Sequence, residues 1–232
     1  MLTVEIENFL ARGLALMELP LAGQPEALSR LSLYFHELIK WNRKINLVAR
    51  SLDDKQILER HFLDSLTLLA LLPTRTREQE TILDVGTGGG FPGLVLKAAC
   101  PALDVTLIEP RKNRFFFLKH IARTLALKGV EVLAVRLDEQ IEARALSGRR
   151  FSFITSRAFT DIPRFISLAS PYLEKGGRIV LMKGPGAVNE IKDLERQGRK
   201  QKFFVAGTQK FQLPFSKGVR LLVSIREKGK EK

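Results

Sequence analysis

The sequence predicts an α/β protein with a doubly wound, mostly parallel, seven-stranded sheet and a helical region at its N-terminus. A short apolar strand pattern at residues 81–85 runs into a turn with four glycines and then into a helical pattern at residues 93–100. Strand and helix patterns then alternate to the C-terminus, whereas residues 1–75 show helical spacing alone. Such alternation is typical of a parallel sheet with helices on both faces.

Residues 1–75 are predicted to form a helical cap, and residues 76–232 the α/β domain. A first helix falls within residues 1–24 and ends at proline and glycine breakers. From Glu26 a helical apolar stripe follows, with Asn42 as its polar member. Ser51-x-x-Asp54 has the form of a capping box, and it predicts a further helix that runs to about Leu72.

The elements of the α/β domain follow from the alternation of apolar patterns. The predicted strands span residues 81–85, 104–109, 130–135, 151–156, 177–182, 202–208 and 218–226, and the last two can be antiparallel. The predicted helices span residues 93–100, 113–126, 138–146, 162–173 and 187–199. Ligands bind such sheets at the carboxyl ends of the strands. This rule gathers residues 84–91, 109–111, 137–138, 156–157 and Lys183 on one rim.

The glycine loop fits two classes of ligand. Gly88, Gly90 and Gly93 match the dinucleotide fingerprint, with Glu109 near the distance of a ribose-binding acid. Asp84 favours a different ligand, because a carboxylate at the strand end would repel a pyrophosphate. It would attract the α-ammonium group of S-adenosyl-L-methionine (SAM), directly or through water, while Glu109 would hold the ribose. The stretch resembles Rossmann-like SAM-dependent methyltransferases, and a nicotinamide-dependent oxidoreductase is the weaker alternative.

Charge and cysteine content limit the class of partner and the compartment. The formal net charge is +13 and the pI is about 10.1, which favours a polyanionic partner such as nucleic acid, unless the charge serves solubility alone. Cys100 is the only cysteine, so an internal disulfide is excluded and a reducing, cytoplasmic setting is expected. No apolar stretch approaches the roughly 18 residues of a membrane span. No cluster has the spacing of a metal site, so we expect none.

Five short motifs give a more specific resemblance. They are Lys40-Trp41-Asn42-x-x-x-Asn46-Leu47, Arg60-His61-x-x-Asp64-Ser65-Leu66, Asp84-Val-Gly-Thr-Gly-Gly-Gly-Phe-Pro-Gly93, Ser156-Arg157-Ala158 and Lys183-Gly184. Together they resemble the bacterial ribosomal RNA small subunit methyltransferase G family, also called glucose-inhibited division protein B. The resemblance covers roughly residues 28–226.

The resemblance implies SAM-dependent methylation of guanine N7 in 16S ribosomal RNA, in a loop near the decoding site. By motif, the family's SAM contacts correspond to Gly86, Phe91, Leu137, Asp138 and Arg157. General methyltransferase logic adds Asp84, Gly88 and Glu109. Many family members carry an aspartate and a serine-containing turn where this chain has Glu109-Pro110, so the ribose contact departs from the family pattern.

The sequence lacks the motifs of other methyltransferase chemistries, which agrees with methylation at guanine N7. Guanine N7 is a lone-pair nucleophile without a proton to lose, so methylation requires placement and no general base. Accordingly, no catalytic residue is assigned. An Asn/Asp-Pro-Pro-aromatic motif, typical of enzymes that methylate exocyclic amines, is absent after the fourth strand. Cys100 is poorly placed for a covalent nucleophile and is expected to be a buried apolar residue.

Contacts with RNA are predicted on the rim. The favoured cluster is Arg111, Lys112 and Arg114, with Lys183 as a further candidate for a base or a phosphate. Two other basic clusters, at residues 40–50 and 196–210, remain alternatives. His61, Asp64 and Ser65 suggest a hydrolase triad, but they lack a strained strand-to-helix elbow. We therefore expect them to form a polar network that joins the cap to the α/β domain.

The sequence thus predicts a monomeric, cytoplasmic enzyme whose partner is 16S ribosomal RNA, the 30S subunit or its precursor, with no membrane association. Three alternatives remain. They are a small-molecule methyltransferase, a non-catalytic RNA-binding or assembly factor on the same scaffold, and the oxidoreductase. SAM binding measured against NAD binding separates the last of these from the others.

Overall fold

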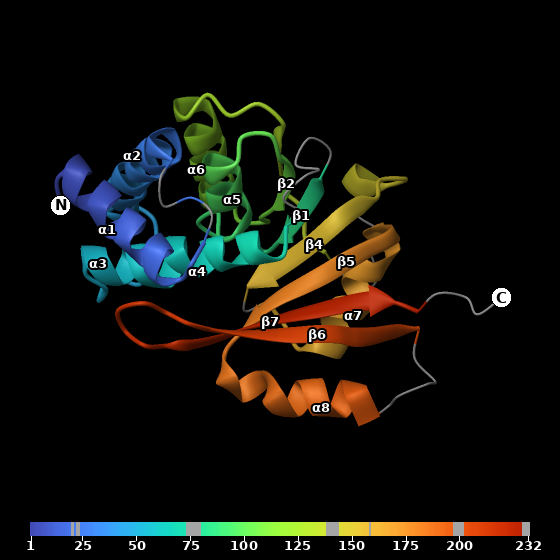
Figure 1. The fold of residues 1–232 in the computed structure, drawn as a ribbon. Helices are drawn as coiled ribbons and strands as arrows, with labels where there is room; N and C mark the ends of the chain where they lie inside the picture. Colours follow the sequence, from blue (N-terminus) through green and yellow to red (C-terminus); the bar gives the residue numbers. More distant parts are fainter. Residues whose placement is uncertain are drawn as a thin grey trace.

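Seven strands form one sheet in the order β3-β2-β1-β4-β5-β7-β6 (Figure 1). The computed structural model describes residues 1–19, 21, 24–72, 80–137, 144–157, 159–196 and 202–228. The strands are β1 (Thr81–Val85), β2 (Asp104–Ile108), β3 (Val130–Leu133), β4 (Phe151–Arg157), β5 (Leu173–Lys183), β6 (Phe203–Gln212) and β7 (Val219–Glu227). β1 to β5 pair in parallel, whereas β7 is antiparallel to both β5 and β6. The predicted doubly wound sheet is confirmed.

Helices cover both faces of this sheet. They are α1 (Thr3–Leu16), α2 (Pro25–Asn42), α3 (Asp54–Ile57), α4 (Asp64–Leu66), α5 (Gly93–Ala99), α6 (Lys112–Thr124), α7 (Ile162–Ala169) and α8 (Val188–Arg196). A π-helix (Leu58–Leu63) joins α3 to α4, and short 3-10 turns lie at Thr67–Ala70, Arg144–Leu146, Ser170–Tyr172 and Pro185–Ala187. In Figure 1, α5 and α6 lie on the face of the sheet that also meets α1 to α4, while α7 and α8 lie on the other face.

The alternation of side chains along each strand separates two apolar cores. On β1, Ile82 belongs to the core beneath α5 and α6, and Leu83 belongs to the core beneath α7 and α8. The first core continues into the helical cap, where Leu31 and Phe62 are fully buried. The cap and one face of the sheet therefore share one apolar core. The predicted domain boundary at residues 75 and 76 lies outside the described residues.

The structure corrects the predicted start of the third cap helix. Asp53, not Ser51, is the N-cap of α3, because its Oδ1 accepts a 2.8 Å hydrogen bond from the Gln56 amide. Gln56 completes the capping box with a 3.0 Å bond from the Asp53 amide to its Oε1. Asp54 instead forms an ion pair at 3.0 Å with the N-terminal ammonium group. The helix predicted to reach Leu72 is a succession of α, π, α and 3-10 segments that ends at Ala70.

Other differences lie at element ends. The helix predicted at residues 138–146 falls mostly outside the described residues. α7 ends at Ala169, and a 3-10 turn with Pro171 as its second residue begins at Ser170. β5 begins four residues before its predicted start. No helix in the described ranges is long and apolar enough to cross a membrane.

The β6–β7 hairpin extends back to the cap. Its tip passes beside the N-terminal helices in Figure 1. There the Glu59 carboxylate accepts hydrogen bonds from the amides of Phe215 (2.7 Å) and Ser216 (2.8 Å). The Phe215 ring also packs on Phe9, with 4.4 Å between ring centroids. Residues far apart in the sequence thus close one side of the molecule beside the carboxyl ends of the strands.

Candidate active site

The glycine loop after β1 adopts backbone conformations that favour glycine. Gly86 has φ +72° and Gly90 has φ +93°. A Cβ at Gly86 would lie 2.7 Å from Cδ2 of Phe159, and a Cβ at Gly90 would overlap the Tyr34 hydroxyl. Both glycines therefore permit close approach by an aromatic side chain as well as a left-handed turn. Any side chain larger than hydrogen at either position would displace these aromatic residues.

Asp84 is enclosed beneath this loop. Its side chain is fully buried, and Oδ2 accepts hydrogen bonds from the Thr87 hydroxyl (2.6 Å) and the Gly93 amide (2.8 Å). Its Oδ1 has no hydrogen-bond partner among the described residues. Burial raises the pKa of Asp84 from 3.8 to about 6, against the lowering effect of those two bonds. The carboxylate thus supports the loop and the start of α5, and leaves one buried oxygen available to a further donor.

Glu109 joins the glycine loop to the turn after β2. Its Oε2 accepts a 3.0 Å hydrogen bond from the Gly88 amide, and its Oε1 accepts a 2.9 Å bond from the Arg111 amide. The Arg114 guanidinium lies 3.9 Å from Oε2. A carboxylate has about four acceptor positions, so Glu109 retains capacity for a ribose hydroxyl. Its longer side chain already reaches across the loop that it organises.

A cavity of about 390 Å³ opens between the ends of β1 and β2. We call it the rim cavity. It is lined by Gly86, Ile108, Pro110, Arg111, Arg136, Leu137 and Phe159. Ile108, Pro110 and Leu137 provide apolar walls suited to a purine ring, and Glu109 stands beside them. The Gly86 position, which a Cβ would fill, and the unpaired Oδ1 of Asp84 also fit SAM. The residues present are therefore compatible with the predicted cofactor.

The other predicted cofactor contacts lie at different depths. Gly88 is half-buried, is not among the residues that line the cavity, and donates its amide to Glu109. The Phe91 side chain is buried against the cap, with its ring parallel to that of Tyr34 and 4.9 Å from the His61 ring. Asp138 lies outside the described residues. Direct contact between the cofactor and these residues stays a prediction.

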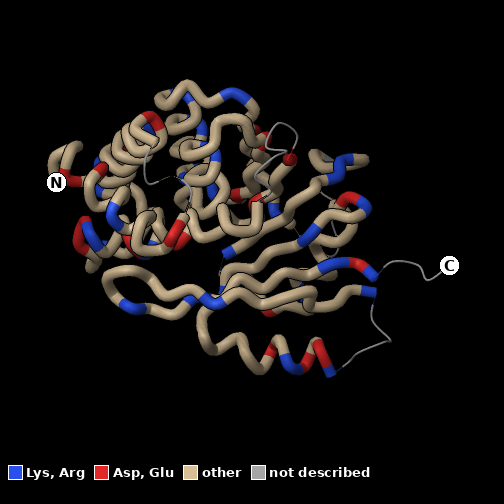
Figure 2. Tube along the Cα trace, in the orientation of Figure 1, with Lys and Arg blue, Asp and Glu red and all other residues tan. Residues whose placement is uncertain are grey.

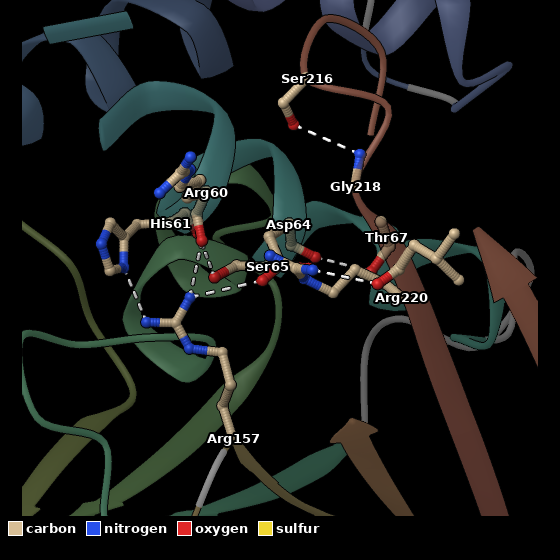
Figure 3. Close-up of polar contacts among 10 residues, drawn as sticks. Arg60, His61, Asp64, Ser65, Thr67, Arg157, Ser216, Gly218 and Arg220 are labelled. Atoms are coloured by element: carbon tan, nitrogen blue, oxygen red, sulfur yellow. Dashed lines mark hydrogen bonds and ion pairs between the residues drawn. The ribbon is translucent and has the colours of Figure 1, made fainter. Parts of the chain in front are cut away.

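Arg157, at the end of β4, connects the sheet to the cap (Figure 3). Its guanidinium donates a 2.9 Å hydrogen bond to the Arg60 carbonyl and lies 2.7 Å from Nδ1 of His61. It also lies over the Phe91 ring, 5.2 Å from the centroid. Arg157 therefore holds the π-helix of the cap against the glycine loop.

Asp64 lies between two arginines in the same network (Figure 3). Its carboxylate is 3.5 Å from Arg157 on β4 and 3.2 Å from Arg220 on β7. Burial raises the pKa of Asp64 more than the two guanidinium groups lower it. Three elements, α4, β4 and β7, thus meet at a single buried carboxylate.

His61 is kept neutral. Burial, followed by the charges of Arg157, Arg60 and Arg220, lowers its pKa from 6.5 to about 3. Neutral Nδ1 can accept the hydrogen bond from Arg157. The Ser65 hydroxyl donates to the His61 backbone carbonyl at 2.5 Å, so these groups have no hydrolase geometry. The predicted network joins the cap to the α/β domain through His61 and Asp64, whereas Ser65 bonds only within the cap.

Tyr34 belongs to the site although no sequence motif indicates it. Its buried hydroxyl donates a 2.5 Å hydrogen bond to the Gly89 carbonyl. Burial raises the pKa of Tyr34, so the hydroxyl remains a donor. Its position three residues after Leu31, on the buried side of α2, was the available signal, but that signal indicates packing and does not reveal a polar partner.

A groove of about 430 Å³ lies between the end of α2 and the start of α6. We call it the basic groove. It is lined by Lys44, Ile45, Asn46, Arg111, Lys112, Asn113 and Arg114. Arg111 also lines the rim cavity, so the groove and the cavity adjoin. Figure 2 shows further Lys and Arg residues along the rest of the chain. The groove nevertheless brings Arg111, Lys112 and Arg114, three of the four predicted RNA contacts, together with Lys44.

Lys183 is engaged elsewhere. Its ammonium donates to the Thr160 carbonyl at 2.7 Å and to Glu190 at 3.0 Å, and its side chain is 13% exposed. It joins the end of β5 to the segment after β4 and to α8. A contact with RNA would require these bonds to exchange, so Lys183 stays a prediction with less geometric support than the basic groove.

Known proteins resemble this chain over most of its length. A family model described as rRNA small subunit methyltransferase G matches residues 27–219. A protein from Desulfotalea psychrophila named ribosomal RNA small subunit methyltransferase G is 39% identical over 227 residues, which cover 97% of this chain and 100% of that protein. A protein of the same name from Myxococcus xanthus is 40% identical and covers 81% of this chain and 82% of its own length.

Solved structures share the fold at low sequence identity. A ribosomal protein L11 methylase from Lactobacillus delbrueckii subsp. bulgaricus has a TM-score of 0.53 at 13% identity, covering 73% of this chain and 79% of that one. A chain of a fibrillarin/Nop5p complex has a TM-score of 0.53 at 14% identity, covering 77% and 88%. At such identities the likeness concerns the fold alone.

Proposed function

The chain belongs to the rRNA small subunit methyltransferase G family, and from that premise we propose that it methylates N7 of a guanine in 16S ribosomal RNA. The enzyme is a methyltransferase, and its cofactor is SAM. The position of the target guanine, in a loop near the decoding site, is proposed from the resemblance of the sequence motifs.

When bound, SAM supplies an electrophilic methyl group on a sulfonium. We propose that the apolar walls of the rim cavity hold the adenine, that Glu109 holds the ribose and that Oδ1 of Asp84 receives the ammonium group, directly or through water. Arg157 would act on this site through Phe91, on which it stacks, and through the π-helix that it secures. Asp138 is retained as a proposed contact from its motif.

The proposed chemistry requires placement alone. The lone pair of guanine N7 forms the new bond to carbon as the carbon–sulfur bond breaks, and the product ring carries the positive charge. No proton leaves N7, so no general base is needed. His61, the histidine nearest the loop, has a pKa of about 3 and its Nδ1 faces Arg157, which agrees with a supporting role.

One observation supports the proposal of an RNA substrate. The rim cavity adjoins the basic groove, because Arg111 lines both. A small-molecule methyltransferase would close a dry pocket, whereas here the pocket borders an open, cationic groove. Phosphates would bind such a groove with an affinity that falls steeply with salt. Lys183 remains the fourth proposed RNA contact.

The oxidoreductase alternative is weakened by topology. Dinucleotide-binding sheets of the doubly wound class have the strand order 3-2-1-4-5-6 and parallel strands. Here the antiparallel β7 lies between β5 and β6. A non-catalytic assembly factor is disfavoured because the loop, Asp84 and Glu109 retain the geometry of a cofactor site.

We propose further that the enzyme acts as a cytoplasmic monomer on the 30S subunit or its precursor. The helical cap at residues 1–75 and the α/β domain at residues 76–232 are proposed to function as one unit, since they share one core.

The decisive experiment measures transfer of labelled methyl groups from SAM to ribosomal RNA and to small subunits from cells that lack this protein. Digestion to nucleosides then identifies the product. We expect label in 7-methylguanosine of 16S RNA. Label in another nucleoside would contradict the N7 assignment, and absence of label despite SAM binding would favour the small-molecule alternative.

A further inference from the structure

Helix α6 exposes an aromatic ring beside the basic groove. Phe116 is 49% exposed, which is high for a large apolar side chain. We propose that the start of α6 and the end of α2 form a docking site for an unpaired RNA strand, with phosphates in the basic groove and one base stacked on Phe116. The identity of the RNA rests on the proposed function, but the binding site itself can be tested without methyl transfer.

The cations of the groove are available to a ligand. Lys44, Arg111 and Lys112 are exposed, and none of them forms an ion pair with an acidic side chain in the described part of the chain. Arg114, in contrast, is held by Glu109 and by a 3.0 Å hydrogen bond to the Asn46 carbonyl. Arg114 therefore supports the floor of the groove, while the other three leave their charge for phosphates.

The exposed ring continues the groove along α6. Lys112, Phe115, Phe116 and Lys119 follow one another at the i, i+3, i+4 and i+7 positions, which place them on one side of a helix. The Phe115 ring supports the Phe116 ring edge to face, with 5.5 Å between centroids and 72° between planes. Lys112 lies 6.0 Å from the Phe116 ring and Lys119 lies 5.5 Å from the Phe115 ring.

Such a strip fits an unpaired strand better than a duplex. Bases in a duplex are stacked on each other and offer no free face, whereas unpaired bases stack on aromatic side chains. Cations beside the ring would hold the flanking phosphates. Because the groove adjoins the rim cavity at Arg111, a strand bound here has its next nucleotides beside the cofactor pocket.

The test compares the full chain with three variants in fluorescence anisotropy titrations. The probes, used without SAM, are a labelled single-stranded RNA oligonucleotide and a hairpin of the same composition whose bases are all paired except for a minimal loop. We expect Phe116→Ala to weaken binding of the single strand on the order of tenfold, as one lost stacking contact predicts, with little change for the hairpin. Phe116→Tyr, which keeps the ring, should bind as the wild type does. Lys44→Ala should weaken both and reduce the salt dependence by about one ion.

A matched control is Phe204→Ala, because Phe204 is 39% exposed on β6, outside the groove. It should bind RNA as the wild type does, and calorimetry should give unchanged SAM affinity for Phe116→Ala. Equal losses for Phe204→Ala and Phe116→Ala would overturn the proposal. So would unchanged binding in Phe116→Ala, tighter binding of the hairpin than of the single strand, or tighter binding of anionic lipid vesicles than of either RNA.

The two proposals fail in different ways. Loss of single-strand binding in Phe116→Ala supports the docking site even if the wild type methylates no 16S RNA, an outcome that would contradict the proposed function alone. Methylation of 16S RNA at the wild-type rate by Phe116→Ala, together with unchanged strand binding, would leave the proposed function standing and overturn the docking site.

Discussion

The hydroxyl of Tyr34 on α2 donates a 2.5 Å hydrogen bond to the carbonyl of Gly89 in the glycine loop. The same hydroxyl occupies the space that a Cβ at the neighbouring Gly90 would need. The helical cap therefore contacts the backbone of the glycine loop through a directional hydrogen bond as well as through apolar packing. The conformation of the predicted cofactor loop depends on a residue 55 positions away in the sequence.

We predict that Tyr34→Phe reduces both stability and SAM affinity. The substitution keeps the ring and leaves a buried carbonyl without its donor, which costs about 1–3 kcal/mol. Urea unfolding and calorimetric titration with SAM measure the two effects. The chain has one other tyrosine, Tyr172, whose hydroxyl has no hydrogen bond in the described structure, so Tyr172→Phe is the matched control. Equal effects of the two substitutions would contradict a specific role for the Tyr34 bond.

Local pattern was sufficient for the sheet but not for the cap contacts. The apolar residues of 81–85 and the glycine turn identify β1 and its loop, because strand burial and turn conformation depend on neighbouring residues. Arg220, by contrast, reaches Asp64 only because β7 inserts antiparallel beside β5. No periodicity in a single sequence encodes that pairing.

The role of Asp84 illustrates the same limit within the site. Its place at the end of β1 predicted a cofactor contact, and the unpaired Oδ1 remains compatible with one. The bonds of Oδ2 to Thr87 and Gly93 were not predicted, since they depend on how the loop folds back over the strand. The capping box failed at Ser51 for a related reason: Asp53 and Gln56 fit a similar spacing, and only the backbone geometry selects between them.

We predict that Asp64→Asn destabilises the protein by about 3 kcal/mol. Loss of the carboxylate leaves Arg157 and Arg220 facing each other in a largely buried site, and an unpaired buried charge is costly. Asp193→Asn is the control, because the Asp193–Arg196 pair on α8 is exposed and should contribute little. Thermal and urea unfolding at pH 7 measure both variants. Wild-type stability in Asp64→Asn would show that the network carries no net free energy.

His61 should make stability depend on acid pH. Its folded pKa of about 3 lies below its usual 6.5, so the unfolded chain binds the proton more tightly. The free energy of unfolding should therefore decrease as pH falls below 6.5, by at most about 1.4 kcal/mol per pH unit. His61→Gln should lose this dependence, because glutamine keeps an acceptor and does not titrate. If the free energy of unfolding of His61→Gln decreases with falling pH as much as that of the wild type, other groups cause the pH dependence.

Asp84 should make the protein less stable as pH rises, which is opposite to the effect of His61. Its folded pKa of about 6 exceeds its ordinary 3.8, so the folded state binds the proton more tightly and loses stability as pH rises from about 4 to 6. SAM affinity should rise over the same range if the ionised Oδ1 receives the ammonium group. Asp84→Asn should remove both dependences and bind SAM weakly at every pH. Calorimetry between about pH 4 and 8 measures the affinity, and a flat wild-type profile would contradict the ammonium contact.

Gly86 and Phe159 form the last test, because they meet at the rim cavity. Gly86→Ala places a methyl group 2.7 Å from the Phe159 ring and also strains a backbone with φ +72°, a strain of about 1 kcal/mol. We expect its SAM affinity to fall at least fivefold. Adding Phe159→Ala removes the steric contact but not the backbone strain, so the double variant should recover part of the loss. Calorimetric titration of the wild type, both single variants and the double variant completes the cycle. No recovery would mean that the backbone of Gly86, and not the approach of Phe159, limits the cavity.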